Sequence, residues 1–109
     1  MSKREVQARA ELFAALGDAT RLRLVARLEC GERCSIAELT AETKLTRQAV
    51  RKHLRVLERV RVVHARSEGR ERMYELNVQP MEEMRAYLER VSAHWDRALG
   101  RLKAMVEES

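Results

Sequence analysis

The chain has 109 residues, 45% of them hydrophobic and 36% charged, and its formal net charge is +5. This length suits one small domain over residues 1–109, and four glycines and one proline exclude a disordered chain or a turn-rich all-β fold. No stretch approaches the ~18 apolar residues of a membrane span, and the first residues lack the apolar core of a signal peptide. We therefore expect a cytoplasmic protein without a membrane partner.

Two amphipathic helices are expected first. The apolar residues of the first helix recur at steps of four, three and three: Val6, Ala10, Phe13 and Leu16. Leu12 lies at the edge of that stripe. Gly17 is typical of a helix end, and Asp18 is a good N-cap for a second helix that ends near Gly31.

A helix-turn-helix is expected next. In "SIAELTAET", Ser35 and Glu38 have the spacing of a capping box, which predicts a short helix over residues 36–43. Thr46 then caps a longer helix. The inward stripe of that helix is Val50, Leu54, Leu57 and Val60. The opposite face carries Arg47, Gln48, Arg51, Lys52 and Arg55. Two short helices joined by a few residues, the second basic on its outer face, are typical of a helix-turn-helix.

Positive charge is concentrated in this part of the chain. Residues 44–72 contain ten Lys/Arg and three acidic residues, whereas the rest of the chain contains 12 basic and 14 acidic residues. Such a concentration indicates an anionic partner, and within a helix-turn-helix it favours double-stranded DNA over a merely solvated helix. We expect five residues to enter the major groove: Thr46, Arg47, Gln48, Arg51 and Lys52. Arg55 and Arg59 lie further along, where phosphate contacts are expected, and the base-reading residues stay open.

A change of period marks a β-hairpin. "VRVVHARSEGRERMYEL" alternates on either side of "SEGRE", which predicts two strands and a turn that contains Gly69. We expect Arg70 to contact the minor groove or flanking phosphates. The same role for Arg66 and Arg72 stays open.

A long helix is expected last, with Pro80 in its first turn. Its apolar residues alternate at steps of three and four: Met81, Met84, Leu88, Val91, Trp95, Ala98, Leu102 and Met105. This 3.5-residue period is typical of a helix packed along another helix. We expect a homodimer through the first and last helices. The interface residues would include Leu12, Leu88, Val91, Trp95 and Leu102. A ligand pocket around Trp95 is the alternative.

The order helix, helix, helix-turn-helix, hairpin, helix resembles the ArsR/SmtB family of bacterial winged-helix regulators. "LFAALGDATRLRLVARL", "LTRQAVRKHLRVLERVRVV" and "EGRERMYEL" resemble the family's opening, recognition helix and wing. The resemblance implies a mainly α fold with a small β-hairpin wing, about five helices and a dimer. The last helix resembles a subgroup that does not sense metals. The chain departs at Thr46-Arg47 and Arg51, where the family often has Ser-Gln and Ser, and at Arg61, where it commonly has Gly.

Neither a metal site nor a catalytic site is expected. Metal-sensing relatives carry Cys-x-Cys in the short helix, and here Ser35 and Ala37 stand at those positions. Cys30 and Cys34 have no third ligand nearby, and a redox role for them stays open. No nucleophile–base set or Gly-rich phosphate loop appears, so we expect neither an enzyme nor a cofactor.

The sequence thus predicts a dimeric winged-helix transcriptional regulator, a repressor on an inverted repeat, with an unknown effector. Its two recognition helices would lie about one turn of DNA apart, ~34–36 Å. Two alternatives stay open: a winged-helix module that binds an acidic protein partner, and a nonspecific DNA-binding protein.

Overall fold

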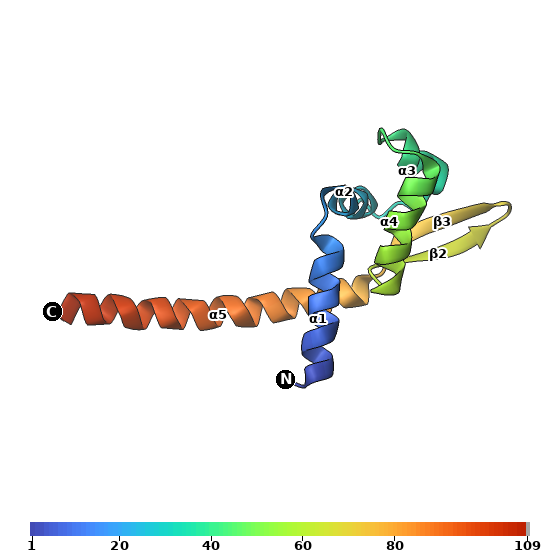
Figure 1. Ribbon diagram of the computed structural model, residues 1–109. Coiled ribbons are helices and arrows are strands. Elements are labelled where there is room, and N and C mark those ends of the chain that lie inside the picture. Colours follow the sequence, from blue (N-terminus) through green and yellow to red (C-terminus); the bar gives the residue numbers. More distant parts are fainter. Residues whose placement is uncertain (109) are drawn as a thin grey trace. The chain divides into compact units, whose positions relative to one another are not determined.

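The computed structural model describes residues 1–108 (Figure 1). It forms two units, residues 1–78 and the helical segment from Gln79 onward, which are described separately. The elements follow in this order: α1 (Lys3–Leu16), α2 (Ala19–Leu28), β1 (Cys34–Ser35), α3 (Ile36–Ala41), α4 (Arg47–Arg59), β2 (Val63–Glu68), β3 (Glu71–Leu76) and α5 (Val78–Glu108). The expected fold class, five helices with a β-hairpin wing, is confirmed.

Helix α1 begins earlier than its apolar stripe predicts. Ser2 caps it by accepting a hydrogen bond from the backbone N–H of Glu5 at 3.1 Å. Gly17 ends it, as expected. Asp18 then caps α2, because its carboxylate accepts from the backbone N–H of Arg21 at 3.1 Å. A short polar turn therefore separates the two helices at the predicted place.

Helices α3 and α4 form the helix-turn-helix. The Ser35 side chain accepts from the Glu38 backbone N–H at 3.1 Å while Glu38 accepts from the Ser35 N–H, so the expected capping box is present. The helix ends at Ala41, two residues short of the expected end. Thr46 caps α4 through the backbone N–H of Ala49 at 3.1 Å.

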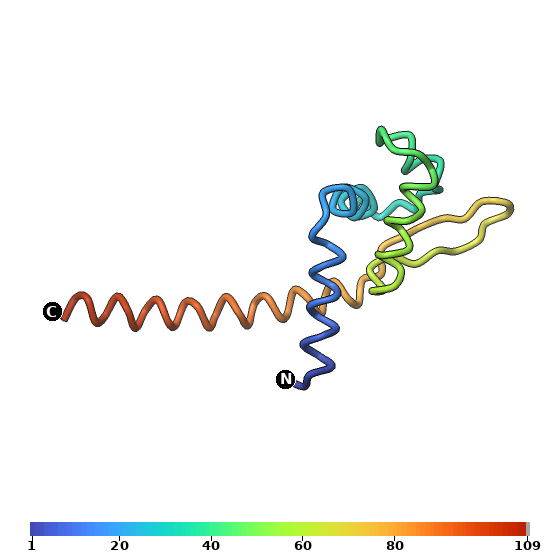
Figure 2. The backbone as a smooth tube through the Cα atoms, viewed as in Figure 1, coloured from blue at the N-terminus to red at the C-terminus, as the bar shows by residue number. Residues whose placement is uncertain are grey.

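The wing is part of a three-stranded sheet, not an isolated hairpin. Strands β2 and β3 run antiparallel as a long hairpin (Figure 2), with Ala65 opposite Tyr74. The order in the sheet is β1-β3-β2. The two-residue strand β1 pairs with β3 through Cys34 opposite Tyr74 and Ser35 opposite Met73. This strand was not expected, because two residues are too short to show a period.

The core of the first unit lies between the helix-turn-helix, α2 and the sheet. Its large buried side chains have at most 4% of their surface exposed: Leu24, Val25, Leu28, Leu39, Val50, Leu54, Leu57, Val62, Val63 and Tyr74. From the expected stripe of α4, Val50, Leu54 and Leu57 are fully buried, whereas Val60 is only partly buried. Helix α1 contributes only Ala15 to the core among its described residues. Val6, which belongs to its expected apolar stripe, is exposed.

Helix α5 is the long last helix, and its apolar stripe is largely exposed to solvent. It begins two residues before Pro80 and runs for 31 residues. Exposed large apolar side chains along it include Leu88, Trp95, Leu99, Leu102 and Met105. Across residues 1–108, no helix is both long enough and apolar enough to cross a membrane.

Candidate nucleic-acid interface

The outer face of α4 carries basic side chains that have no ion-pair partner within residues 1–108. All five expected residues on this face are exposed: Arg47, Gln48, Arg51, Lys52 and Arg55. Within residues 1–108, none of these side chains makes a hydrogen bond or an ion pair with another part of the chain. Opposite charges three or four positions apart on a helix surface can pair, but no acidic residue lies between Arg47 and Arg55. This face is therefore available to an external anion.

The inner face fixes the direction of that basic face. Val50, Leu54 and Leu57 are each 0% exposed and recur at steps of four and three, so one side of α4 is buried along its length. The 13 residues of the helix span ~20 Å, enough to follow a DNA groove across several base pairs. Burial of the stripe thus holds the cationic residues outward as a row.

A contact that the sequence did not reveal joins α4 to the first two helices. The Arg21 guanidinium donates to the backbone carbonyls of Ala14, at 3.3 Å, and Ala15, at the end of α1, and to Nδ1 of His53 on α4 at 3.2 Å. The Asp18 carboxylate lies 3.8 Å from the same His53 nitrogen. The pKa of Asp18 is lowered, chiefly by the hydrogen bond from the Arg21 backbone N–H. Arg21 therefore satisfies carbonyls at the end of α1 and positions the recognition helix.

The end of α4 shows how one departure from the family pattern is accommodated. Arg61 has φ 65°, the left-handed conformation that a glycine adopts without cost. Its N–H donates to the carbonyl of Glu58, and the N–H of Val62 donates to that of Leu57, each at 3.0 Å. These two bonds form a Schellman motif. The turn into the wing is therefore kept with arginine at this position.

In the wing, ion pairs distinguish the three arginines. Arg66 donates to Glu75 at 2.8 Å, and Arg72 lies 3.7 Å from Glu58 of α4. Arg70 follows Gly69, whose φ of 63° forms the turn, and it has no ion pair within residues 1–108. Arg70 is thus the wing arginine whose charge stays uncompensated.

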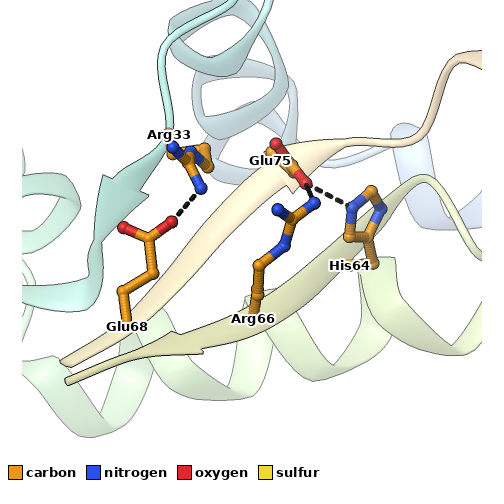
Figure 3. A network of polar contacts seen from close by, with 5 residues as sticks. All are labelled: Arg33, His64, Arg66, Glu68 and Glu75. Carbon is orange, nitrogen blue, oxygen red and sulfur yellow. Dashed lines mark hydrogen bonds and ion pairs between the residues drawn. The ribbon is translucent and has the colours of Figure 1, made fainter. Parts of the chain in front are cut away.

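Two of the acidic partners, Glu68 and Glu75, lie on one face of the sheet. Figure 3 shows His64 and Arg66 of β2 pointing toward Glu75 of β3. The His64 Nε2 lies 2.6 Å from the Glu75 Oε1. The pKa of Glu75 is lowered, first by the hydrogen bond from His64. Arg33, just before β1, pairs with Glu68 near the hairpin end. These pairs connect the strands, and one of them compensates Arg66, which the sequence left open as a DNA contact.

The two cysteines differ in their exposure to solvent. Cys30 is exposed, whereas Cys34 is buried in β1, and burial raises the pKa of its thiol. Within residues 1–108, no group of three or more His, Cys, Asp or Glu side chains could hold a metal ion.

The expected interface residues are divided between two helices. Leu12 lies on α1 and is half-buried. Leu88, Val91, Trp95 and Leu102 follow one another along α5, and Trp95 keeps 62% of its surface exposed. Aromatic and aliphatic side chains of this size are seldom left in water as a continuous stripe.

A capped helix-turn-helix, an uncompensated basic recognition helix and a three-stranded wing define a winged helix-turn-helix protein. A family model described as a helix-turn-helix domain matches residues 16–66. The HTH-type transcriptional regulator Rv2034 of Mycobacterium tuberculosis is 38% identical over 87 residues, which cover 80% of this chain and 78% of that protein. The transcriptional repressor SmtB homolog of a Synechocystis species is 41% identical over 76 residues, covering 70% of this chain but only 57% of the homolog.

The structure agrees with these sequence relatives. The solved structure of an ArsR-like transcriptional regulator from a Rhodococcus species superposes with a TM-score of 0.84 at 31% identity. That superposition covers 100% of this chain and 99% of the other. The chain belongs to the ArsR/SmtB family of winged-helix transcriptional regulators.

Proposed function

We propose that the chain is a sequence-specific DNA-binding repressor that acts in the cytoplasm as a homodimer on an inverted-repeat operator. One observation carries the proposal: the exposed face of α4 has four cations, none of them paired within residues 1–108. Those cations are Arg47, Arg51, Lys52 and Arg55.

The chemistry of this face suits DNA better than an acidic protein surface. Arginine can bridge O6 and N7 of guanine, and Gln48 between the cations can read adenine in a bidentate contact. Thr46 lies at the helix N-terminus, where its hydroxyl already accepts from the backbone and can donate to a phosphate. Arg70 extends the basic surface to the wing. A basic helix together with a basic wing turn favours a duplex over a protein partner.

The homodimer is supported by the exposed stripe of α5. Leu88, Trp95 and Leu102 recur at steps of seven, which is the repeat of a helix that packs along another helix. Together with Val91 on α5 and Leu12 on α1, they form the proposed interface. A dimer would present two copies of α4 to successive major grooves, and a bound dimer would cover promoter DNA.

The test is fluorescence anisotropy with labelled DNA from upstream of the chain's own gene, beside a scrambled duplex, at ~150 mM salt. We expect tight binding to the native duplex only. Arg47→Ala and Arg51→Ala should each weaken it by about 1–3 kcal/mol per half-site. Arg97→Ala on α5, which removes an exposed arginine outside the proposed face, is the matched control.

Two outcomes would reject the proposal. Equal and weak binding to both duplexes would indicate phosphate contacts alone, as in a nonspecific DNA-binding protein. Absence of binding to any duplex at low salt would favour the protein-interaction module. No catalytic residue is assigned, since the family consists of transcriptional regulators.

A further inference from the structure

A hollow of about 440 Å³ lies between α2, α3 and the turn that leads into α4. Its volume falls within the range of small-molecule pockets. Leu24 and Leu39, both almost fully buried, line it together with the partly exposed Leu45. These three leucines give it an apolar wall.

The polar lining is mainly cationic. Arg23, Arg27 and Lys44 line the hollow with a single carboxylate, that of Glu42. Arg27 and Glu42 compensate each other, because the Arg27 Nε lies 2.8 Å from the Glu42 carboxylate. Arg23 and Lys44 have no ion pair within residues 1–108. Two uncompensated cations beside an apolar wall attract a negative group that carries an apolar body.

Thr20 also lines this hollow, and its hydroxyl makes no hydrogen bond inside the described part of the chain. It lies in the first turn of α2. A hydroxyl donor and two cations therefore surround the same space from two different elements. A carboxylate group can accept from all three.

The hollow is joined to the DNA-binding surface through the α3–α4 turn. Lys44 and Leu45 are residues of that turn, and Thr46 directly after them caps α4. The Leu45 N–H donates to the Thr43 hydroxyl at 3.1 Å, which fixes the path of the chain into the helix. A molecule bound against Lys44 and Leu45 would therefore contact the segment that determines where α4 begins.

We propose that this hollow binds a small organic anion, a carboxylate joined to a short apolar body, and that the bound anion alters DNA affinity through the α3–α4 turn. The regulatory half of this inference rests on the proposed DNA-binding function. The binding half stands on the lining of the hollow alone. The anion would therefore be the class of effector for this chain.

The binding test is a ¹H–¹⁵N NMR titration of the intact protein without DNA, at constant ionic strength. The probes are benzoate, its uncharged counterpart benzamide, and inorganic phosphate. We expect saturable shifts at the amides of Thr20, Lys44 and Leu45 with benzoate, and at least tenfold weaker binding of the other two probes. Equal shifts with benzoate and benzamide would overturn the anion site. Phosphate that binds as tightly as benzoate would overturn the organic anion in favour of a phosphate group, including one from DNA.

A variant pair keeps the test specific. The double variant Arg23→Gln/Lys44→Gln should lose at least tenfold in benzoate affinity, whereas Arg90→Gln/Arg97→Gln on α5, with the same net charge, should bind as the original chain does. Both are surface changes, and the dispersion of the NMR spectrum reports whether each variant is folded. Equal benzoate affinity in both double variants would contradict the site.

The coupling test adds benzoate to the anisotropy assay with operator DNA. Saturating benzoate should change the DNA affinity at least fivefold, and the Arg23→Gln/Lys44→Gln variant should not respond. An unchanged DNA affinity at saturation would overturn the coupling. Because the NMR titration contains no DNA, a chain that binds benzoate but no operator would reject the proposed function alone, and the opposite result would reject the anion site alone.

Discussion

Arg55→Gln on α4 should make DNA binding less sensitive to salt. Each contact between a protein cation and a phosphate releases condensed counterions, so the slope of log K against log salt counts the contacts, at about −0.9 per phosphate on duplex DNA. Within residues 1–108, these cations of the proposed DNA-binding surface have no ion pair: Arg47, Arg51, Lys52, Arg55 and Arg70.

If each of these cations meets one phosphate, a dimer makes about ten contacts, and its slope is about −9. Raising salt from 50 to 200 mM then weakens binding by a factor on the order of 10⁵. Arg55→Gln removes two contacts per dimer. Its slope should fall to about −7, and its affinity at 150 mM salt should be about thirtyfold lower.

Anisotropy titrations at four or more salt concentrations between 50 and 300 mM give both slopes. Arg90→Gln on α5 has the same charge change outside the proposed surface and should keep the original slope. The reasoning is refuted if Arg55→Gln and Arg90→Gln share one slope.

Leu102→Asp puts a charge on the proposed α5 interface, so it should yield a monomer in analytical ultracentrifugation and abolish operator binding. Ala93→Asp, on the outer side of the same repeat, should stay dimeric. A Leu102→Asp variant that is as dimeric as Ala93→Asp would contradict the interface. Arg61→Gly should raise the free energy of unfolding by up to about 1 kcal/mol. The left-handed conformation at φ 65° costs a non-glycine residue about 1–2 kcal/mol. Part of this gain is lost because glycine increases the conformational entropy of the unfolded chain. The control Arg59→Gly, inside α4, should instead lower the free energy of unfolding by about 0.5–1 kcal/mol. Urea unfolding measures both variants, and an equal loss of stability in the two would exclude strain at Arg61.

Local signals in the sequence account for much of the fold. The capping box at Ser35, the caps Asp18 and Thr46, and the turn at Gly69 were all predicted, because each depends on residues within three or four positions of one another. The basic face of α4 was predicted for the same reason. Helical periodicity alone decides which side chains lie opposite the buried stripe.

The features that were missed depend on residues far apart in the chain. Arg21 and His53 are 32 positions apart, and nothing in either segment indicates that they meet. The ion pair of Arg72 with Glu58 helps to decide which wing arginine stays uncompensated, and it requires the wing to fold back on α4. Whether the segments predicted for the interface meet in a dimer stays a prediction as well.

Ser35 connects the two DNA-facing elements directly. It is paired with Met73 of the wing strand β3, and it is also the residue that caps α3. Because the wing sheet and the helix-turn-helix share this residue, they approach DNA as one rigid body. If α4 enters a groove as proposed, Arg70 would meet the neighbouring phosphates as an intramolecular event at a high effective concentration. The wing contact can then add residence time on DNA without a second loss of rotational freedom.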